Sequence, residues 1–138
     1  MKMWNLCKTA IIISALFGTG SLYAEENLHP KSFTTKNYTK YYSNVKIKNT
    51  WTPFPTPPGN PQDPAVRSVP WLGLKLLCHR AEFCTAELWM KTNTDNPVYI
   101  GEGVMNVNTG EITPKELVSN GFKLTSPEPG VIELRDAE

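Results

Sequence analysis

The sequence predicts a small α+β protein built on a mainly antiparallel sheet of about five strands, with one short helix. Two observations carry this prediction. Short segments of alternating apolar and polar side chains are separated by turn sequences, and no strand–helix repeat typical of a parallel sheet occurs. A sandwich-like closure is the alternative. The ordered part, roughly 90 residues, is enough for one modest core.

Residues 1–24 have the layout of a signal peptide. Lys2 and Lys8 lie near the start, an apolar run covers residues 10–17, and Ala24 precedes two glutamates. A membrane anchor is the alternative, but the apolar run is well short of the ~20 residues that a spanning helix needs. We expect cleavage near Ala24, a periplasmic or secreted chain, and no stable membrane insertion of the mature protein.

Removing this leader also removes Cys7, which leaves Cys78 and Cys84. An even cysteine pair in an exported chain predicts a disulfide. A redox couple is the alternative, but such pairs are typically C-x-x-C at the start of a helix, and here five residues intervene.

The predicted mature chain has no excess of basic residues. Of the fourteen basic residues the leader holds two, which leaves twelve basic and thirteen acidic residues. Without a basic excess, the sequence gives no support for nucleic-acid binding.

Residues 25–50 are polar and aperiodic and are predicted to form a flexible N-terminal arm. Within them, residues 45–48 alternate briefly and fit an edge strand protected by its lysines. Residues 51–70 hold seven prolines, which excludes a helix or a central strand and predicts an extended segment. The segment is either a spacer packed along the domain or a docking ribbon that presents Trp51 and Phe54.

Residues 71–91 are predicted to form a β-hairpin at the start of an α+β domain that covers residues 71–138. Pairing Cys78 with Cys84 leaves only apolar neighbours on one face: Leu76 with Ala86, Leu74 with Leu88, and Leu72 with Met90. The same register sets Lys75 opposite Glu87, and a shift by one residue spoils every match. The hairpin is therefore the predicted centre of the sheet.

The remaining elements follow in order along the chain. Residues 97–107 fit a long strand with a bulge or bend at Gly101 and Gly103. Thr113 fits an N-cap for a short helix over residues 114–119, which Gly121 ends. Residues 122–125 and 131–135 fit a second hairpin, in which Leu124 is expected to pair with Ile132.

The sequence predicts no catalytic residue, no metal site and no cofactor. Only His29 and His79 are present, neither at metal-ligand spacing with the other, and a disulfide-bonded Cys78 cannot act as a nucleophile. The candidate contacts with a protein partner are side chains of the hairpin loop, one strand and the proline-rich segment. These are His79, Arg80, Glu82, Phe83, Trp89, Trp51 and Phe54.

The run NTDNPVYIGEGVMNVNTGEITPKELVSNGFKLTSPEPGVIEL resembles small exported proteins of Legionella-type bacteria. In those proteins a cysteine-bridged hairpin precedes an N-P strand, a TG-x-I-[ST]-P-K segment and an N-G-[FY] segment. The resemblance covers about Leu72–Leu134 and implies export, with release by a host-associated bacterium. Its motifs are structural, so it implies no catalytic residue.

Together these observations favour a non-enzymatic exported protein that binds or adapts a protein partner in the envelope or outside the cell. A component of an envelope secretion complex is one alternative. A small secreted hydrolase or toxin is the other, and it requires His79 in a cleft beside a carboxylate or hydroxyl group.

Overall fold

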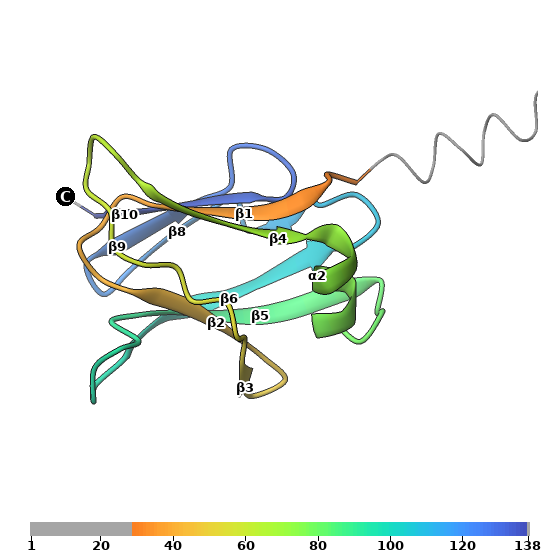
Figure 1. Cartoon of the computed structure of the whole chain (residues 1–138), viewed down its shortest axis with the longest axis horizontal. Helices are drawn as coiled ribbons and strands as arrows, with labels where there is room; N and C mark the ends of the chain where they lie inside the picture. The colour runs from red at the N-terminus through yellow and green to blue at the C-terminus, as the bar shows by residue number, and fades with distance from the viewer. Residues whose placement is uncertain (1–28, 138) are drawn as a thin grey trace, which may run out of the picture.

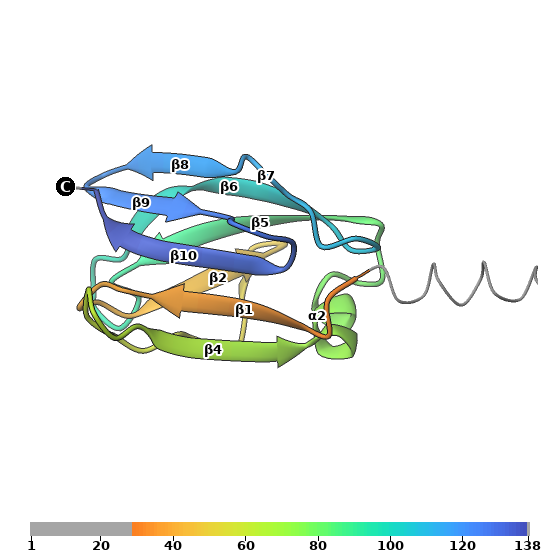
Figure 2. The ribbon, with the colours of Figure 1, turned by 90° about the horizontal axis from the view of Figure 1, so that it is seen from above.

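Two five-stranded sheets lie face to face in the computed structural model, which describes residues 29–137 (Figure 1). The predicted signal peptide lies outside the described residues. The first sheet has the order β4-β1-β10-β9-β8, seen side by side in Figure 2, and the second has the order β3-β2-β5-β6-β7. Every strand pair is antiparallel except β1 with β10. The predicted small, mainly antiparallel α+β fold is confirmed, in the sandwich-like arrangement.

The strands of the first sheet are β1 (Ser32–Asn37), β4 (Ala65–Pro70), β8 (Glu116–Ser119), β9 (Phe122–Thr125) and β10 (Val131–Asp136). Those of the second sheet are β2 (Ser43–Ile47), β3 (Thr50–Trp51), β5 (Phe83–Met90), β6 (Val98–Asn106) and β7 (Ile112–Thr113). The helix α2 (Trp71–Leu77) joins β4 to the turn before β5 and so connects the two sheets. Within the described part, no helix has the length and apolar character needed to cross a membrane.

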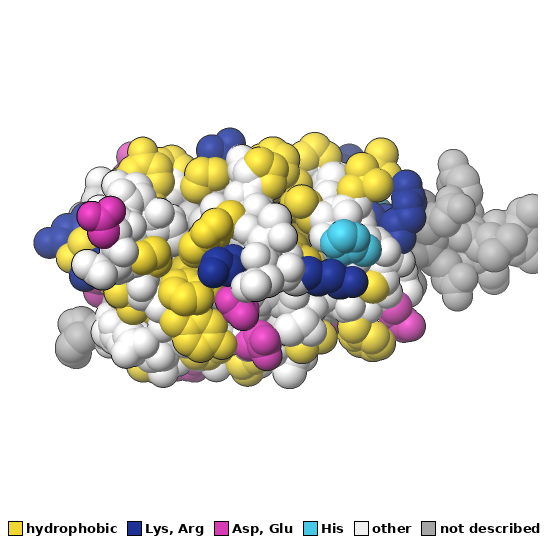
Figure 3. All heavy atoms as spheres, turned by 90° about the horizontal axis from the view of Figure 1, so that it is seen from below, with side chains coloured by type: hydrophobic (Ala, Val, Ile, Leu, Met, Phe, Trp, Pro, Cys, Tyr) yellow, Lys and Arg dark blue, Asp and Glu magenta, His cyan; other side chains and the backbone are white. Residues whose placement is uncertain are grey.

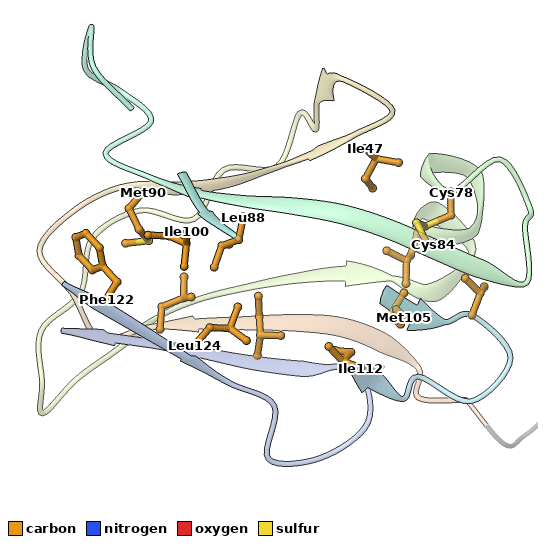
Figure 4. Close-up of a cluster of buried hydrophobic side chains, with 14 of the residues drawn as sticks. Ile47, Cys78, Cys84, Leu88, Met90, Ile100, Met105, Ile112, Phe122 and Leu124 are labelled. Carbon is orange, nitrogen blue, oxygen red and sulfur yellow. A yellow bond between two sulfur atoms is a disulfide. The ribbon is translucent and has the colours of Figure 1, made fainter. Parts of the chain in front are cut away.

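The core lies between the sheets, where inward side chains of both meet (Figure 4). Met90 and Ile100 of the second sheet are almost fully buried, as is Leu134 of the first. Each strand contributes alternate residues to this core, as the period of a half-buried strand requires. At one end α2 closes the core, where the Trp71 indole N–H donates a hydrogen bond of 2.9 Å to the carbonyl oxygen of Val107.

The first strand of the predicted hairpin, residues 71–78, is wrong, because these residues form α2. Trp71, Leu74 and Cys78 are buried at helical spacing, whereas Leu72 and Leu76 are exposed. The run is apolar at nearly every position, so it fits a period of two as well as a period of 3.6. It contains no β-branched residue, and five good helix formers (four leucines and a lysine) follow Pro70, which is the signal that favours the helix.

The disulfide itself is confirmed, with 5.5 Å between the Cα atoms of Cys78 and Cys84. It does not close a hairpin neck. Cys78 is the C-terminal cap residue of α2, and Cys84 is the second residue of β5. The bridge therefore ties the end of the helix to the start of a central strand of the second sheet.

The predicted helix over residues 114–119 is wrong as well. Residues Glu116–Ser119 form β8, which pairs with β9 across a turn at Asn120 and Gly121. Both turn residues have positive φ, 52° and 86°, as expected for the tight hairpin turn that Asn-Gly favours. Asn-Gly was interpreted as a helix end, but the same dipeptide is a stronger signal for a hairpin.

Residues 25–50 do not form a flexible arm where the structure describes them, because β1 and β2 lie within this range. β2 is not an edge strand either, since it pairs with β3 on one side and β5 on the other. In the proline-rich segment, residues 65–70 form β4, an edge strand, where proline at the last position is tolerated. The polar sequence predicts an exposed arm, but Asn37 and Thr39 are buried and bonded to each other. The Thr39 hydroxyl donates a hydrogen bond of 2.8 Å to the side-chain carbonyl oxygen of Asn37.

The later strands agree with prediction. Residues 98–106 form β6, and its register against β5 shifts opposite Gly101, where a bulge was expected. The second hairpin is present as β9 and β10, but Leu124 pairs with Leu134 instead of Ile132. The shift is by two residues, so each side chain keeps its expected face.

Candidate functional site

The outer face of the second sheet carries a cluster of aromatic and charged side chains, which we call the aromatic face. Figure 3 shows this side of the molecule, with hydrophobic side chains beside basic and acidic ones near the middle. Its members come from four neighbouring strands: Lys46 (β2), Trp51 (β3), Glu87 and Trp89 (β5), and Tyr99 and Glu102 (β6).

Trp89 is the centre of the aromatic face. Its ring lies 5.8 Å from the ring of Trp51 in an edge-to-face arrangement and 5.2 Å from the ring of Tyr99. Both geometries are those that aromatic pairs favour. Trp51 and Tyr99 remain 39% and 42% exposed, so the three rings form a fixed but accessible apolar surface.

Lys46 holds its ammonium group over two of these rings. Its Nζ lies 4.7 Å from the ring centroid of Trp51 and 4.8 Å from that of Trp89. Both distances are within the range of a cation–π interaction. Lys46 is directly opposite Glu87 in the sheet, but its ammonium forms no ion pair among residues 29–137. The Lys46 ammonium therefore contacts the two indole rings and leaves the Glu87 carboxylate without an ion-pair partner among these residues.

Two carboxylates stand side by side next to the rings. Glu87 and Glu102 are directly opposite one another in the β5–β6 pair. Glu87 accepts a hydrogen bond of 3.1 Å from the Trp89 indole N–H, and neither carboxylate has an ion-pair partner within the described part. Like charges at opposed positions destabilise a sheet, so this pair has a small electrostatic cost.

The short β3 is fixed to β2 by an amide side chain, and this positions Trp51. The Asn44 side chain accepts a hydrogen bond of 2.6 Å from the Thr52 hydroxyl and donates one of 3.0 Å to the Thr52 carbonyl oxygen. A shallow hollow of about 250 Å³ lies beside Trp51, between Tyr42 and Asn93. The surface next to the aromatic face is thus concave enough to seat a side chain.

Of the predicted contact residues, the structure brings Trp51 and Trp89 together. Phe54 lies apart from them: it is 38% exposed and lines the space between the sheets. Phe83 faces the same side of β5 as Trp89, but the two are six positions apart along the strand, about 20 Å. The seven predicted residues therefore belong to at least two separate surfaces.

The turn between α2 and β5 places His79, Arg80 and Glu82 in solvent. His79 and Arg80 adopt left-handed backbone conformations, with φ of 57° and 59°. The His79 side chain makes no hydrogen bond or ion pair with any other described residue, so it does not lie in the cleft that the hydrolase hypothesis requires. His29 stacks on Trp71 at 5.3 Å, and across residues 29–137 no cluster of three potential metal ligands forms.

Sequence reasoning missed Lys46, Tyr99, Glu87 and Glu102 as members of a site. Lys46 was interpreted as protection of a sheet edge, and Tyr99 was assigned only to a strand. Glu87 was assigned to a charge pair with Lys75 that the helix removes. The signal was present in the alternation of residues 83–90, which puts Glu87 and Trp89 on one face, but the neighbours of this face depend on strand pairing.

Comparison with known proteins identifies a family. A family model described as "NttC: T2SS substrate NttC" matches residues 5–137. The crystal structure of the Legionella pneumophila type II secretion system substrate NttC is similar, with 34% sequence identity and a TM-score of 0.71. The match covers 78% of this chain and 98% of that one. No curated protein matches.

Proposed function

Because this chain belongs to the NttC family of type II secretion substrates and is a secreted protein, we propose that it acts as a binding protein whose contact surface is the aromatic face. The observation that carries this proposal is the ring cluster of Trp51, Trp89 and Tyr99, two of whose rings are exposed, beside two unpaired carboxylates. Tryptophan and tyrosine are the residues that most often dominate the binding energy of protein interfaces.

The partner that fits is a protein segment with a basic side chain next to an apolar one. The carboxylates of Glu87 and Glu102 attract the cation, and the rings of Trp89 and Tyr99 pack against the apolar group and the cation's stem. Because the rings are already held by Lys46 and by each other, the surface loses little side-chain entropy when it binds.

The resemblance to secretion substrates favours cargo of the secretion machinery over a component of it. No described residue arrangement favours the hydrolase or toxin hypothesis, since His79 lies alone in the turn before β5. That the protein is not an enzyme stays a prediction, which turnover assays would test.

A displayed random peptide library tests the chemistry of the partner with a defined probe. Selection on the immobilised protein is expected to enrich peptides that carry Lys or Arg beside an aromatic or aliphatic residue. Trp89→Ala is expected to weaken the selected peptides by about 30-fold, the loss typical of a central interface residue. Charge reversal by Glu102→Lys is expected to abolish their selection. Enrichment of acidic peptides, or binding unchanged by both variants, would contradict the proposal.

Site-specific photocrosslinking tests the surface in the culture of the producing cell. A photoreactive residue at Tyr99 is expected to give a discrete crosslinked product that Trp89→Ala removes. The matched control is the same residue at Val118, which is 59% exposed on β8 of the opposite sheet. Equal products from both positions would mean that the aromatic face has no special role.

A further inference from the structure

A cavity of about 120 Å³ lies between the two sheets, and its lining includes positions Glu87 of β5 and Glu102 of β6. Most of its lining is apolar and comes from both sheets and α2, including Val45, Leu77, Ala86, Leu124 and Ile132. Its lining reaches the surface at Phe54, which is 38% exposed in the proline-rich segment. The space is close to that of a protein cavity of about 150 Å³ that takes up benzene.

Two pairs of polar residues lie at one end of this cavity, and Asn44, Thr52, Glu87 and Glu102 also line it. Arg67 of β4 is directly opposite Thr35 of β1, and both face the other sheet. Ser43 and Thr56 pair through backbone hydrogen bonds of 3.0 Å and 2.8 Å. The two pairs meet because the Arg67 Nε–H donates a hydrogen bond of 3.0 Å to the carbonyl oxygen of Pro55, the neighbour of Thr56.

The polar end has unused hydrogen-bonding capacity. The hydroxyl-bearing residues Thr35, Ser43 and Thr56 are 7%, 1% and 3% exposed, and their side chains form no hydrogen bond within residues 29–137. The terminal Nη groups of Arg67 likewise have no partner in this part of the chain. Buried polar groups in native proteins are nearly always satisfied, so an unsatisfied set around a cavity indicates a ligand with acceptor atoms.

We propose that this cavity is a binding site for a small carboxylic acid whose apolar part is no larger than about a benzene ring. The carboxylate accepts hydrogen bonds from the Arg67 guanidinium in the forked geometry that arginine favours, and from the hydroxyl of Thr35. The apolar part lies against Ala86, Leu124 and Ile132. None of the three rings of the aromatic face lines this cavity, and the site does not depend on the function proposed for that face.

Titration with pentanoate tests the site directly, followed by the methyl signals of the core in NMR spectra. Pentanoate is expected to bind at least about tenfold more tightly than 1-pentanol and pentylamine, because only the acid matches Arg67. Arg67→Gln is expected to remove this preference, and Arg67→Lys to retain part of it, while thermal unfolding checks that both variants fold. Val118→Ala is the control, because Val118 is exposed on β8 and does not line the cavity, and this variant is expected to bind pentanoate as the parent protein does.

Filling the cavity is the second arm of the test. Ala86→Val adds two methyl groups on the inner face of β5 and is expected to abolish pentanoate binding without lowering the melting temperature. If the space beside Ala86 were already filled, the added methyl groups would overpack the core and lower the melting temperature. Equal affinity for pentanoate and 1-pentanol, binding unaffected by Arg67→Gln, or no saturable shift of core signals would each overturn the proposal.

Discussion

β5 carries an aromatic side chain near each end of its outer face, and the two ends differ in what surrounds these rings. Trp89 is enclosed by Trp51, Tyr99 and Lys46, which reach it from three other strands. Phe83 is 57% exposed and has no aromatic or cationic neighbour within the described part. The same strand thus has an aromatic ring packed against neighbouring side chains at one end and an aromatic ring without such neighbours at the other.

The difference lies in how each end is held. At the Trp89 end, β5 lies between β2 and β6, and cross-strand side chains fix the ring. At the Phe83 end, β2 no longer pairs with β5, which is held there by its pairing with β6 and by the covalent link to α2 through Cys84. A disulfide fixes backbone positions but supplies no neighbour for an outward side chain. The pairing with β2 and β3, which brings Lys46 and Trp51 to Trp89, therefore creates the candidate contact surface in this molecule.

Removal of the disulfide is expected to have the largest effect on stability, and it tests whether the Phe83 end and the Trp89 end of β5 are independent. Cys78→Ala with Cys84→Ala is expected to lower the free energy of unfolding by about 2–4 kcal/mol, since the bridge restricts the unfolded chain and both cysteines are buried. Urea unfolding measures the loss. The near-UV circular dichroism of the ring cluster is expected to persist in the folded variant. Loss of this signal under native conditions would show that the two ends are coupled.

Truncation of the two rings is the next test, with an intermediate effect. Trp89→Ala removes contacts with two rings and the ammonium of Lys46, and is expected to cost about 1–2 kcal/mol. Phe83→Ala is the matched variant on the same strand and is expected to change stability by less than about 0.5 kcal/mol. Thermal unfolding compares them. Equal losses would contradict the distinction between a supported and an unsupported ring.

The sequence predicts more of the fold than of the candidate site, and the reason is physical. Alternation and turn chemistry are local, so the strands of residues 83–90, 98–106, 122–125 and 131–136 could be found. The α2 segment could not be assigned by period, because apolar residues at nearly every position satisfy both a strand and a helix.

The site depends on contacts that no local pattern holds. The sequence predicts Trp51 and Trp89 as candidate contact residues, but their meeting requires β2 to insert between β3 and β5. Lys46 contacts both indole rings only because β2 lies between β3 and β5. Arg67 and Thr35 are 32 positions apart and become neighbours only when β4 pairs with β1. Such long-range pairings are set by the whole core.

The smallest expected effect concerns the paired carboxylates at the Trp89 end. Glu102→Gln removes one of two like charges on neighbouring strands and is expected to raise the free energy of unfolding by a few tenths, about 0.3 kcal/mol, at low ionic strength. Glu111→Gln is the matched control of opposite sign, because Glu111 pairs with Lys115 and its loss is expected to destabilise slightly.

Both effects are expected to shrink in about 1 M salt, where exposed charges are screened. Thermal unfolding at two salt concentrations measures them. If Glu102→Gln destabilises the protein at low salt, the carboxylate already has a favourable partner, and the attraction of an external cation loses its basis. If it stabilises, the protein retains a small electrostatic cost at its aromatic face, and a bound basic side chain would offset that cost.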